Sequence, residues 1–182
     1  MKLLIVDAQE LIVTKELYHY EVFCSNIRKL IHAARQHGHE VIYIRHDDGV
    51  GAVLTMNQPG YVVFHGFAPA SDEKIFDKHV NSPFKESGLL EYLQKTHETT
   101  LMIVGLQTDY CIDATIKCGF EHGFKLLVPA NCNSTFDNSY MTAKQTYHYY
   151  NDFMWKGRYA SCISFEEAIH QLEQCSLQSY IE

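Results

Sequence analysis

The sequence lacks any stretch close to the roughly 20 consecutive apolar residues that a membrane-spanning helix requires. The apolar run Leu3–Val6 near its start stops at Asp7 after four residues. The apolar part of a secretory signal needs roughly seven or more. We therefore expect a buried strand at this position and no signal peptide, and a membrane is not expected as a partner.

Basic runs are also missing. The chain has 15 Lys and Arg residues against 22 Asp and Glu, which gives a formal net charge of −7. Proteins that bind nucleic acid gather positive charge on one face, and attraction to an anionic membrane depends on the same charge. The composition therefore argues against nucleic acid as a partner.

No C-x-x-C pair occurs among the six cysteines. A chain of this length buries a core large enough to fold without disulfide staples. The pattern predicts reduced thiols in a cytoplasmic protein. Cys111 alone stands where a thiol could do chemistry. The other cysteines are expected to be inert, mostly as core filler: Cys24, Cys118, Cys132, Cys162 and Cys175.

Apolar runs of strand length alternate with segments of helical periodicity along the whole chain. This alternation predicts a parallel sheet covered on both faces. We expect residues 1–182 to form one domain, a three-layer α/β/α sandwich with a mainly parallel, Rossmann-like sheet of about six strands. The expected strands are 2–6, 40–45, 74–76, 99–104, 124–128 and 160–163, and the expected helices are 21–36, 87–95, 109–121, 139–153 and 165–173.

Polar residues follow three of the predicted strands directly. In a doubly wound sheet the ligand lies beyond the carboxyl ends of the strands, where the strand order reverses. Asp7 follows the first predicted strand, and Lys78 follows the third. The segment 106–111, which ends in Cys111, follows the fourth predicted strand. The sequence thus predicts that a carboxylate, an ammonium and a thiol meet at one edge of the sheet.

Each of these three groups has a possible catalytic role. Cys111 falls near the first turn of the helix expected from residue 109, where backbone amides and the helix dipole lower the pKa of a thiol. Asp7 could take the thiol proton and return it to a leaving group. Lys78 could keep Asp7 ionised and stabilise the charge that develops during attack. On spacing alone, a packed thiol, a turn Asp and a solvated Lys remain open alternatives.

Three ordered segments resemble the motifs of the isochorismatase-like cysteine hydrolases. The family's Asp-x-Gln, Lys…Ser-x-Phe and Gly-x-x-Thr-x-x-Cys motifs are similar to Asp7-Ala8-Gln9, to Lys78 with Ser82-Pro83-Phe84, and to Gly105-Leu106-Gln107-Thr108-Asp109-Tyr110-Cys111. The resemblance runs from residue 3 to about residue 135, and Pro129-Ala130 stands where the family usually has Asp-Ala. The ordered set, with each segment at a strand end, is far more specific than any one segment.

The resemblance implies a catalytic triad of Asp7, Lys78 and Cys111. It also implies a non-proline cis peptide between Leu106 and Gln107, with the backbone amides of Gln107 and Cys111 forming an oxyanion hole. Members of the family associate, so a homo-oligomer, either a dimer or a tetramer, is expected. The aromatic content of 13% agrees with such an interface.

One segment departs from the pattern of the family's nicotinamidases, which hold a metal through an Asp-x-His pair and further histidines after the second strand. Here the residues are Arg45-His46-Asp47-Asp48. His46 and His65 could still meet in space, but two histidines without a fuller ligand set are usually structural. We predict no catalytic metal and no organic cofactor, and nicotinamide becomes a less favoured substrate.

The walls of the substrate pocket are expected to come from one amide, one aliphatic and three aromatic side chains. Ile12 stands where the family has an aromatic residue, which alters one wall. Packing in the core or between subunits is the alternative for the aromatic residues, and it is the favoured one for Trp155. The expected pocket residues are Gln9, Ile12, Tyr61, Phe84 and Tyr110.

Retention of the cysteine points to acyl transfer, because true isochorismatases cleave a vinyl ether and lack that nucleophile. We expect hydrolysis of a small-molecule amide, at its C–N bond, through a covalent acyl-enzyme on Cys111. A cysteine phosphatase is disfavoured, since Lys117 stands where its Arg would be, and a thiol oxidoreductase is disfavoured by the missing C-x-x-C pair. A non-catalytic member of the fold that binds a small ligand or a partner remains open.

Overall fold

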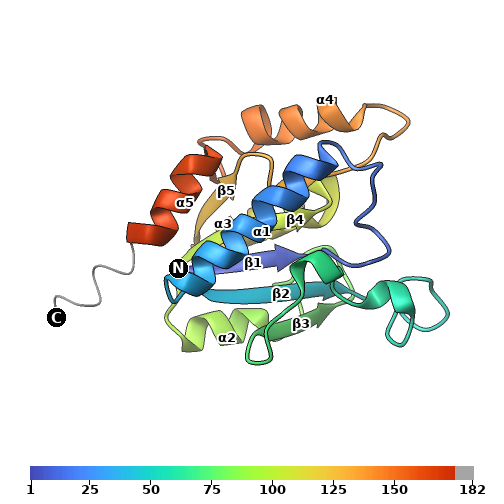
Figure 1. Ribbon diagram of the computed structural model, residues 1–182, viewed down its shortest axis with the longest axis horizontal. Helices are drawn as coiled ribbons and strands as arrows, with labels where there is room; N and C mark the ends of the chain where they lie inside the picture. The colour runs from blue at the N-terminus through green and yellow to red at the C-terminus, as the bar shows by residue number, and fades with distance from the viewer. Residues whose placement is uncertain (175–182) are drawn as a thin grey trace.

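The computed structural model describes residues 1–174. The predicted inert Cys175 lies outside the described residues, and the five cysteines within them are free thiols. Strands and helices alternate along the chain (Figure 1). The elements are β1 (Lys2–Val6), α1 (Tyr20–Gln36), β2 (Glu40–His46), η1 (Pro59–Tyr61), η2 (His65–Phe67), β3 (Lys74–Lys78), α2 (Leu89–Lys95), β4 (Thr100–Leu106), η3 (Thr108–Ile112), α3 (Asp113–Glu121), β5 (Lys125–Pro129), β6 (Asn133–Ser134), α4 (Ala143–His148), η4 (Tyr149–Met154), β7 (Ser161–Ile163) and α5 (Phe165–Gln174).

The strands form one parallel sheet in the order β3-β2-β1-β4-β5-β7, with β6 paired to β4. The predicted α/β fold is confirmed. Among the described residues the sheet has seven strands, one more than the six predicted, because the two residues of β6 are too short to leave a hydrophobic pattern in the sequence. The order reverses between β1 and β4, so the carboxyl ends of these two strands mark the crevice of a doubly wound sheet.

Side chains of β1 alternate between two cores, one on each face of the sheet. Leu3 and Ile5 belong to the core that α1 and α5 cover, and α1 is seen crossing that face in Figure 1. Leu4 and Val6 belong to the core that α2 and α3 cover. This alternation follows from the two-residue period of a strand, and it produces the three layers.

Two helices begin later than the periodicity of the sequence suggests. The segment from Thr108 first makes the π-helical η3, and α3 follows only from Asp113. The helix expected from residue 139 begins after Thr142, whose side chain accepts a hydrogen bond from the backbone N–H of Gln145 in a capping box. Caps and π-helical turns depend on local hydrogen bonds and not on apolar spacing, which explains both differences.

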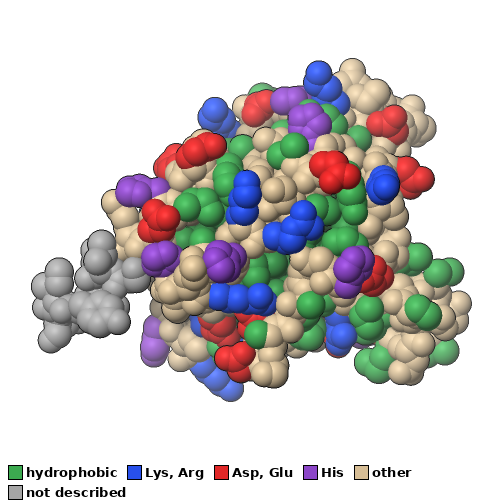
Figure 2. Space-filling view, in the orientation of Figure 1, with side chains coloured by type: hydrophobic (Ala, Val, Ile, Leu, Met, Phe, Trp, Pro, Cys, Tyr) green, Lys and Arg blue, Asp and Glu red, His purple; other side chains and the backbone are tan. Residues whose placement is uncertain are grey.

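Surface charge is mixed. Lys and Arg side chains are interspersed with Asp and Glu over the face that Figure 2 shows. Within the part of the chain that the structure describes, no helix is long and apolar enough to cross a membrane.

Gly105 allows β4 to pass β1 closely where the site begins. Its φ is 123°, and a Cβ at this position would lie 2.0 Å from the backbone oxygen of Val6.

We expect Gly105→Ala to lower the free energy of unfolding by about 3 kcal/mol or more. The strain of a positive φ in alanine and the overlap of its Cβ with the backbone of β1 both contribute to this loss. Urea unfolding measures this. Gly123→Ala is the control, since its φ is 84° but its Cβ would meet nothing within 4 Å. Equal losses in the two variants would refute the role of the close approach.

Candidate active site

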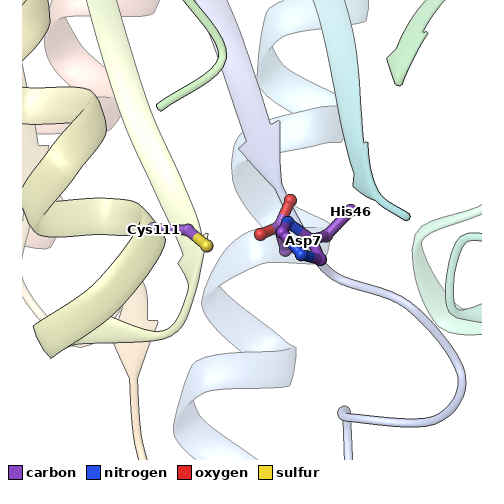
Figure 3. A group of neighbouring side chains, drawn as sticks. All are labelled: Asp7, His46 and Cys111. Atoms are coloured by element: carbon purple, nitrogen blue, oxygen red, sulfur yellow. The ribbon is translucent and has the colours of Figure 1, made fainter. Parts of the chain in front are cut away.

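Four side chains meet at the carboxyl end of the sheet. Asp7 follows β1, His46 ends β2 and Lys78 ends β3, while Cys111 lies in η3 after β4. Parallel pairing aligns these strand ends, with His46 opposite Lys78 in register. Figure 3 shows the sulfur of Cys111 pointing toward the carboxylate of Asp7, with His46 beside it. The structure therefore brings together Asp7, Lys78 and Cys111, and it adds His46.

The ammonium of Lys78 is the centre of this cluster. Its Nζ donates to Asp7 Oδ2 at 2.7 Å, to His46 Nδ1 at 2.9 Å and to Cys111 Sγ at 3.2 Å. An ammonium has three N–H donors, and each finds one acceptor here. The Lys78 side chain is fully buried, so this complete set of partners is what allows a charge to remain inside the protein.

His46 is held in one tautomer by its two partners. Because Nδ1 accepts from the Lys78 ammonium, the ring hydrogen lies on Nε2, which donates to Asp48 Oδ1 at 2.9 Å. His65, which the sequence left as a possible neighbour, bonds Glu10 Oε1 and has a side chain 80% exposed. The two histidines therefore do not share a site.

Metal-ligand residue types do occur in the cluster. Asp7, His46 and Cys111 each offer one ligand atom, and these atoms lie within 4.8 Å of one another. The Lys78 ammonium contacts all three residues, so the positive charge that a metal would supply is already present. A metal bound to these atoms would have to displace that buried ammonium. The donor set therefore does not fit a metal centre while Lys78 is in place.

One oxygen of the Asp7 carboxylate is left without a partner. Oδ1 is buried and has no hydrogen bond within residues 1–174, whereas Oδ2 accepts from Lys78. Burial raises the pKa of Asp7 above its ordinary value, against the opposing charge of Lys78. Oδ1 therefore has a free lone pair, and the carboxyl group to which it belongs has a raised pKa. Both properties suit it to accept a proton from a neighbouring group.

The thiol of Cys111 is harder to ionise than the sequence suggests. Burial, followed by the negative charge of Asp7, raises its pKa to about 12, although Lys78 acts in the opposite direction. The prediction of a lowered pKa is wrong, because Cys111 lies in a buried π-helical turn and not at an open helix start. The resting thiol is therefore protonated at neutral pH, and reaction requires a base.

The turn that carries Cys111 is fixed from several sides. The peptide bond between Leu106 and Gln107 is cis. The carbonyl oxygen of Gln107 accepts hydrogen bonds from the amides of Tyr110 and Ile112. Thr108 Oγ1 is buried and donates to Asn133 Oδ1 at 2.8 Å, which ties the turn to β6. These contacts hold the thiol in one position relative to the strand ends.

A cavity of about 490 Å³ opens beside the thiol. This volume suits a small molecule. Ile12 and Tyr110, both expected in the pocket, do line it, and so does Gln107. Asp7 and Cys111, predicted as catalytic, line it as well. The remaining walls were not predicted, and half of them, Asp48, Val53 and Leu54, come from the segment after β2, whose course the sequence did not reveal. The lining residues are Asp7, Leu11, Ile12, His46, Asp48, Val53, Leu54, Asn81, Gln107, Tyr110 and Cys111.

Gln9 was expected in the pocket wall, and the structure corrects this. It is fully buried. Its side-chain Nε2 donates to the backbone oxygens of His46 and Tyr61, and its Oε1 accepts from the N–H of His46. An amide has donors and an acceptor, so one side chain satisfies both backbone groups of His46. Gln9 therefore positions the end of β2 and does not face the cavity.

Two of the expected aromatic walls also lie elsewhere. Tyr61 is buried, and the Cζ atom of the Arg45 guanidinium lies 4.5 Å from the centre of the Tyr61 ring. Phe84 stacks on Phe124 in the core below α3. Trp155 is fully buried, as favoured from the sequence, and donates to Asp113 Oδ1. Large rings gain most from full burial, which is why an aromatic near a motif is weak evidence for a pocket.

Besides His46, Asn81 and Asp48 are polar cavity residues that the sequence did not place in the site. Cys111 Sγ donates to Asn81 Oδ1 over a long 3.8 Å, and Asp48 bonds His46. The available signal for Asp48 was the departure from Asp-x-His after β2. This departure indicated that the site differs from that of the nicotinamidases, but it did not predict which groups Asp48 contacts.

Fold and site define an α/β protein in which a carboxylate, an ammonium and a thiol meet at the strand ends beside a cavity of small-molecule size. The family model of the Isochorismatase domain matches residues 2–152, and the chain belongs to this family. The resemblance seen in the sequence motifs is thereby confirmed.

Named relatives include hydrolases. The isochorismatase family protein YrdC of Bacillus subtilis is 30% identical over 112 residues, 61% of this chain and 60% of that protein. A streptothricin hydrolase of Streptomyces noursei is 27% identical over 110 residues, 60% of this chain and 40% of its own length. The chain thus spans less than two thirds of either relative. The N-carbamoylsarcosine amidase of Thermoplasma acidophilum has the same fold, with a TM-score of 0.75 at 19% identity over 91% of this chain and 98% of that one.

Proposed function

We propose that this protein hydrolyses the C–N bond of a small-molecule amide, with Cys111 as nucleophile, Asp7 as general base and acid, and Lys78 as the charge that holds them. The observation that carries the proposal is the combination of a protonated buried thiol with an Asp7 carboxylate oxygen that has no hydrogen-bond partner within residues 1–174. Membership of a family with hydrolases among its relatives, and a fold shared with an amidase, support it.

The first half-reaction transfers the acyl group to the protein. Asp7 Oδ1 takes the proton of Cys111 Sγ, and the sulfur attacks the carbonyl carbon of the amide. Movement of this proton keeps the net charge of the buried cluster unchanged, which avoids the cost of a new isolated charge. The carbonyl oxygen becomes an oxyanion, for which the backbone amides of Gln107 and Cys111 are the proposed donors. The C–N bond then breaks as Asp7 returns its proton to the leaving nitrogen.

The second half-reaction releases the acid. Water attacks the thioester carbon while Asp7 takes one of its protons. The C–S bond breaks, the carboxylic acid leaves, and the proton returns to Cys111 Sγ. Amide and water are consumed, acid and amine are formed, and the protein ends as it began. Lys78 stays charged throughout, and it offsets the negative charge whether that charge is on the carboxylate or on the sulfur.

A trapped acyl-enzyme is the direct test. A panel of primary amides would be screened for ammonia release, and reactions would be quenched in acid, digested and analysed by mass spectrometry. We expect the peptide that contains Cys111 to gain the mass of the acyl group, because a thioester survives acid. Ammonia release with no adduct, and with no loss in Cys111→Ala, would contradict the proposal. Amides that bind and stabilise the protein with no ammonia release would instead support the non-catalytic, ligand-binding alternative.

A further inference from the structure

The charges on the cavity wall are of one sign. Among residues 1–174, the lining includes Asp7 and Asp48 but no Lys or Arg side chain. The charge of Asp7 is balanced by Lys78. Asp48 has only the N–H of His46, which is neutral because its other nitrogen accepts from Lys78. The cavity therefore presents one carboxylate whose charge no neighbouring cation cancels.

Asp48 is also held in place before anything binds. Its backbone N–H donates to the carbonyl oxygen of Leu54 at 2.9 Å, and its Oδ1 accepts from His46 Nε2 at 2.9 Å. The side chain is 51% exposed, so the second oxygen, which makes no other hydrogen bond among the described residues, can meet a ligand. A fixed carboxylate loses little freedom on binding, which favours recognition of a charge.

The remaining walls strengthen the effect of that charge. Leu11, Ile12, Val53 and Leu54 are apolar, and the ring of Tyr110 is 53% exposed. Apolar surroundings lower the local dielectric, so a charge interacts more strongly there than in water. The face of a tyrosine ring also attracts cations. The net charge of the chain, −7, acts in the same direction at longer range.

We infer that the preferred substrates are amides whose non-reacting part carries a positive charge, that carboxylate-bearing amides are disfavoured, and that Asp48 determines this selectivity. The inference about substrates rests on the proposed function, whereas the charge selectivity of the cavity does not depend on it. It can therefore be measured on the thiol without turnover.

Charged thiol reagents provide that measurement. Two methanethiosulfonates, one with a trimethylammonium and one with a sulfonate group, each transfer their thioalkyl group to the thiolate of Cys111 and release methanesulfinate. Their rates at Cys111, resolved by peptide mass spectrometry, are divided by their rates with 2-mercaptoethanol. We expect the ratio of cation to anion to fall about tenfold in Asp48→Asn. The pKa of the thiol cancels in this ratio, since the same sulfur reacts with both reagents.

Asp72→Asn is the matched control, because Asp72 is exposed, lies outside the cavity lining and carries the same charge. Its ratio should equal that of the wild type. The inference is overturned if both variants change the ratio equally, since the effect would then be one of net charge alone. It is also overturned if the wild type shows no preference for the cation.

Three amides then separate the inference from the proposed function. They are 5-aminopentanamide, pentanamide and glutaramic acid, which differ in the charge of the distal group. We expect kcat/KM to fall in that order, and Asp48→Asn to remove most of the difference. If the carboxylate compound is the best substrate, the inference fails and the hydrolase stands. If no amide is cleaved while the reagent ratio depends on Asp48, the hydrolase fails and the charge selectivity stands.

Discussion

Replacing Cys111 by alanine should lower kcat/KM for amide hydrolysis by about 10⁶-fold, as removal of the nucleophile does in a well-studied covalent hydrolase. The remaining oxyanion donors and Asp7 would retain only a small residual rate. Cys111 is 8% exposed and contributes little volume to the core, so the variant should fold. Steady-state ammonia release from an accepted amide measures the loss, and circular dichroism checks the fold.

A matched variant guards against a general effect of thiol removal. Cys118 lies in α3, seven positions along the chain, is half-buried and does not line the cavity. Cys118→Ala should keep the wild-type rate. If Cys111→Ala retains a tenth or more of the wild-type kcat/KM, a direct attack by water would explain the activity better than a covalent intermediate.

Lys78→Met is expected to cause the largest loss of stability, about 3–5 kcal/mol. Without the ammonium, the buried Asp7 carboxyl must keep a proton that the unfolded chain releases near neutral pH, and this difference costs stability. Asp7 is 2% exposed, its Oδ2 accepts from Lys78, and within residues 1–174 its Oδ1 has no hydrogen-bond partner. His46 and Cys111 would lose a donor at the same time. Urea unfolding near neutral pH measures the change, and activity should also be lost, since Asp7 would hold its proton.

The double variant Asp7→Asn/Lys78→Met tests whether the buried Asp7 carboxyl is the cause. With both ionisable groups removed, we expect at least half of the lost stability to return, while activity stays absent. Lys117→Met is the control, since Lys117 pairs with Asp113 at the surface and such a pair contributes about 0.5 kcal/mol. A double variant no more stable than Lys78→Met would refute this explanation.

The loss in Lys78→Met should also depend on pH in one direction. Burial raises the pKa of Asp7 in the folded protein above its ordinary value of 3.8, and without Lys78 the upward shift is larger. Above pH 4 the unfolded chain releases this proton while the folded variant keeps it. The unfolded state then binds fewer protons, so stability falls as pH rises. The difference in free energy of unfolding between Lys78→Met and the wild type should therefore be smallest near pH 4 and largest near pH 7.

The strands and the residues that follow them could be predicted because both are local properties of the chain. A run such as Lys2–Val6 is apolar throughout because it is buried on both faces. The position of Asp7, Lys78 and Cys111 at strand ends, together with the rule for the crevice of a doubly wound sheet, was enough to predict that they meet. The motif order indicated the family for the same reason.

The walls of the cavity and the protonation of the thiol were decided by tertiary structure. Gln9 and Phe84 lie within the motifs, yet packing against distant segments directs both away from the cavity. His46 seemed structural until the register of β2 and β3 set its Nδ1 against Lys78, 32 positions further along the chain. Burial is likewise a property of the whole fold, and it raised the pKa of Cys111 where a helix start alone would have lowered it. The sequence by itself determined which reactive groups meet, and only the packing around them decided where their protons lie and what the cavity can hold.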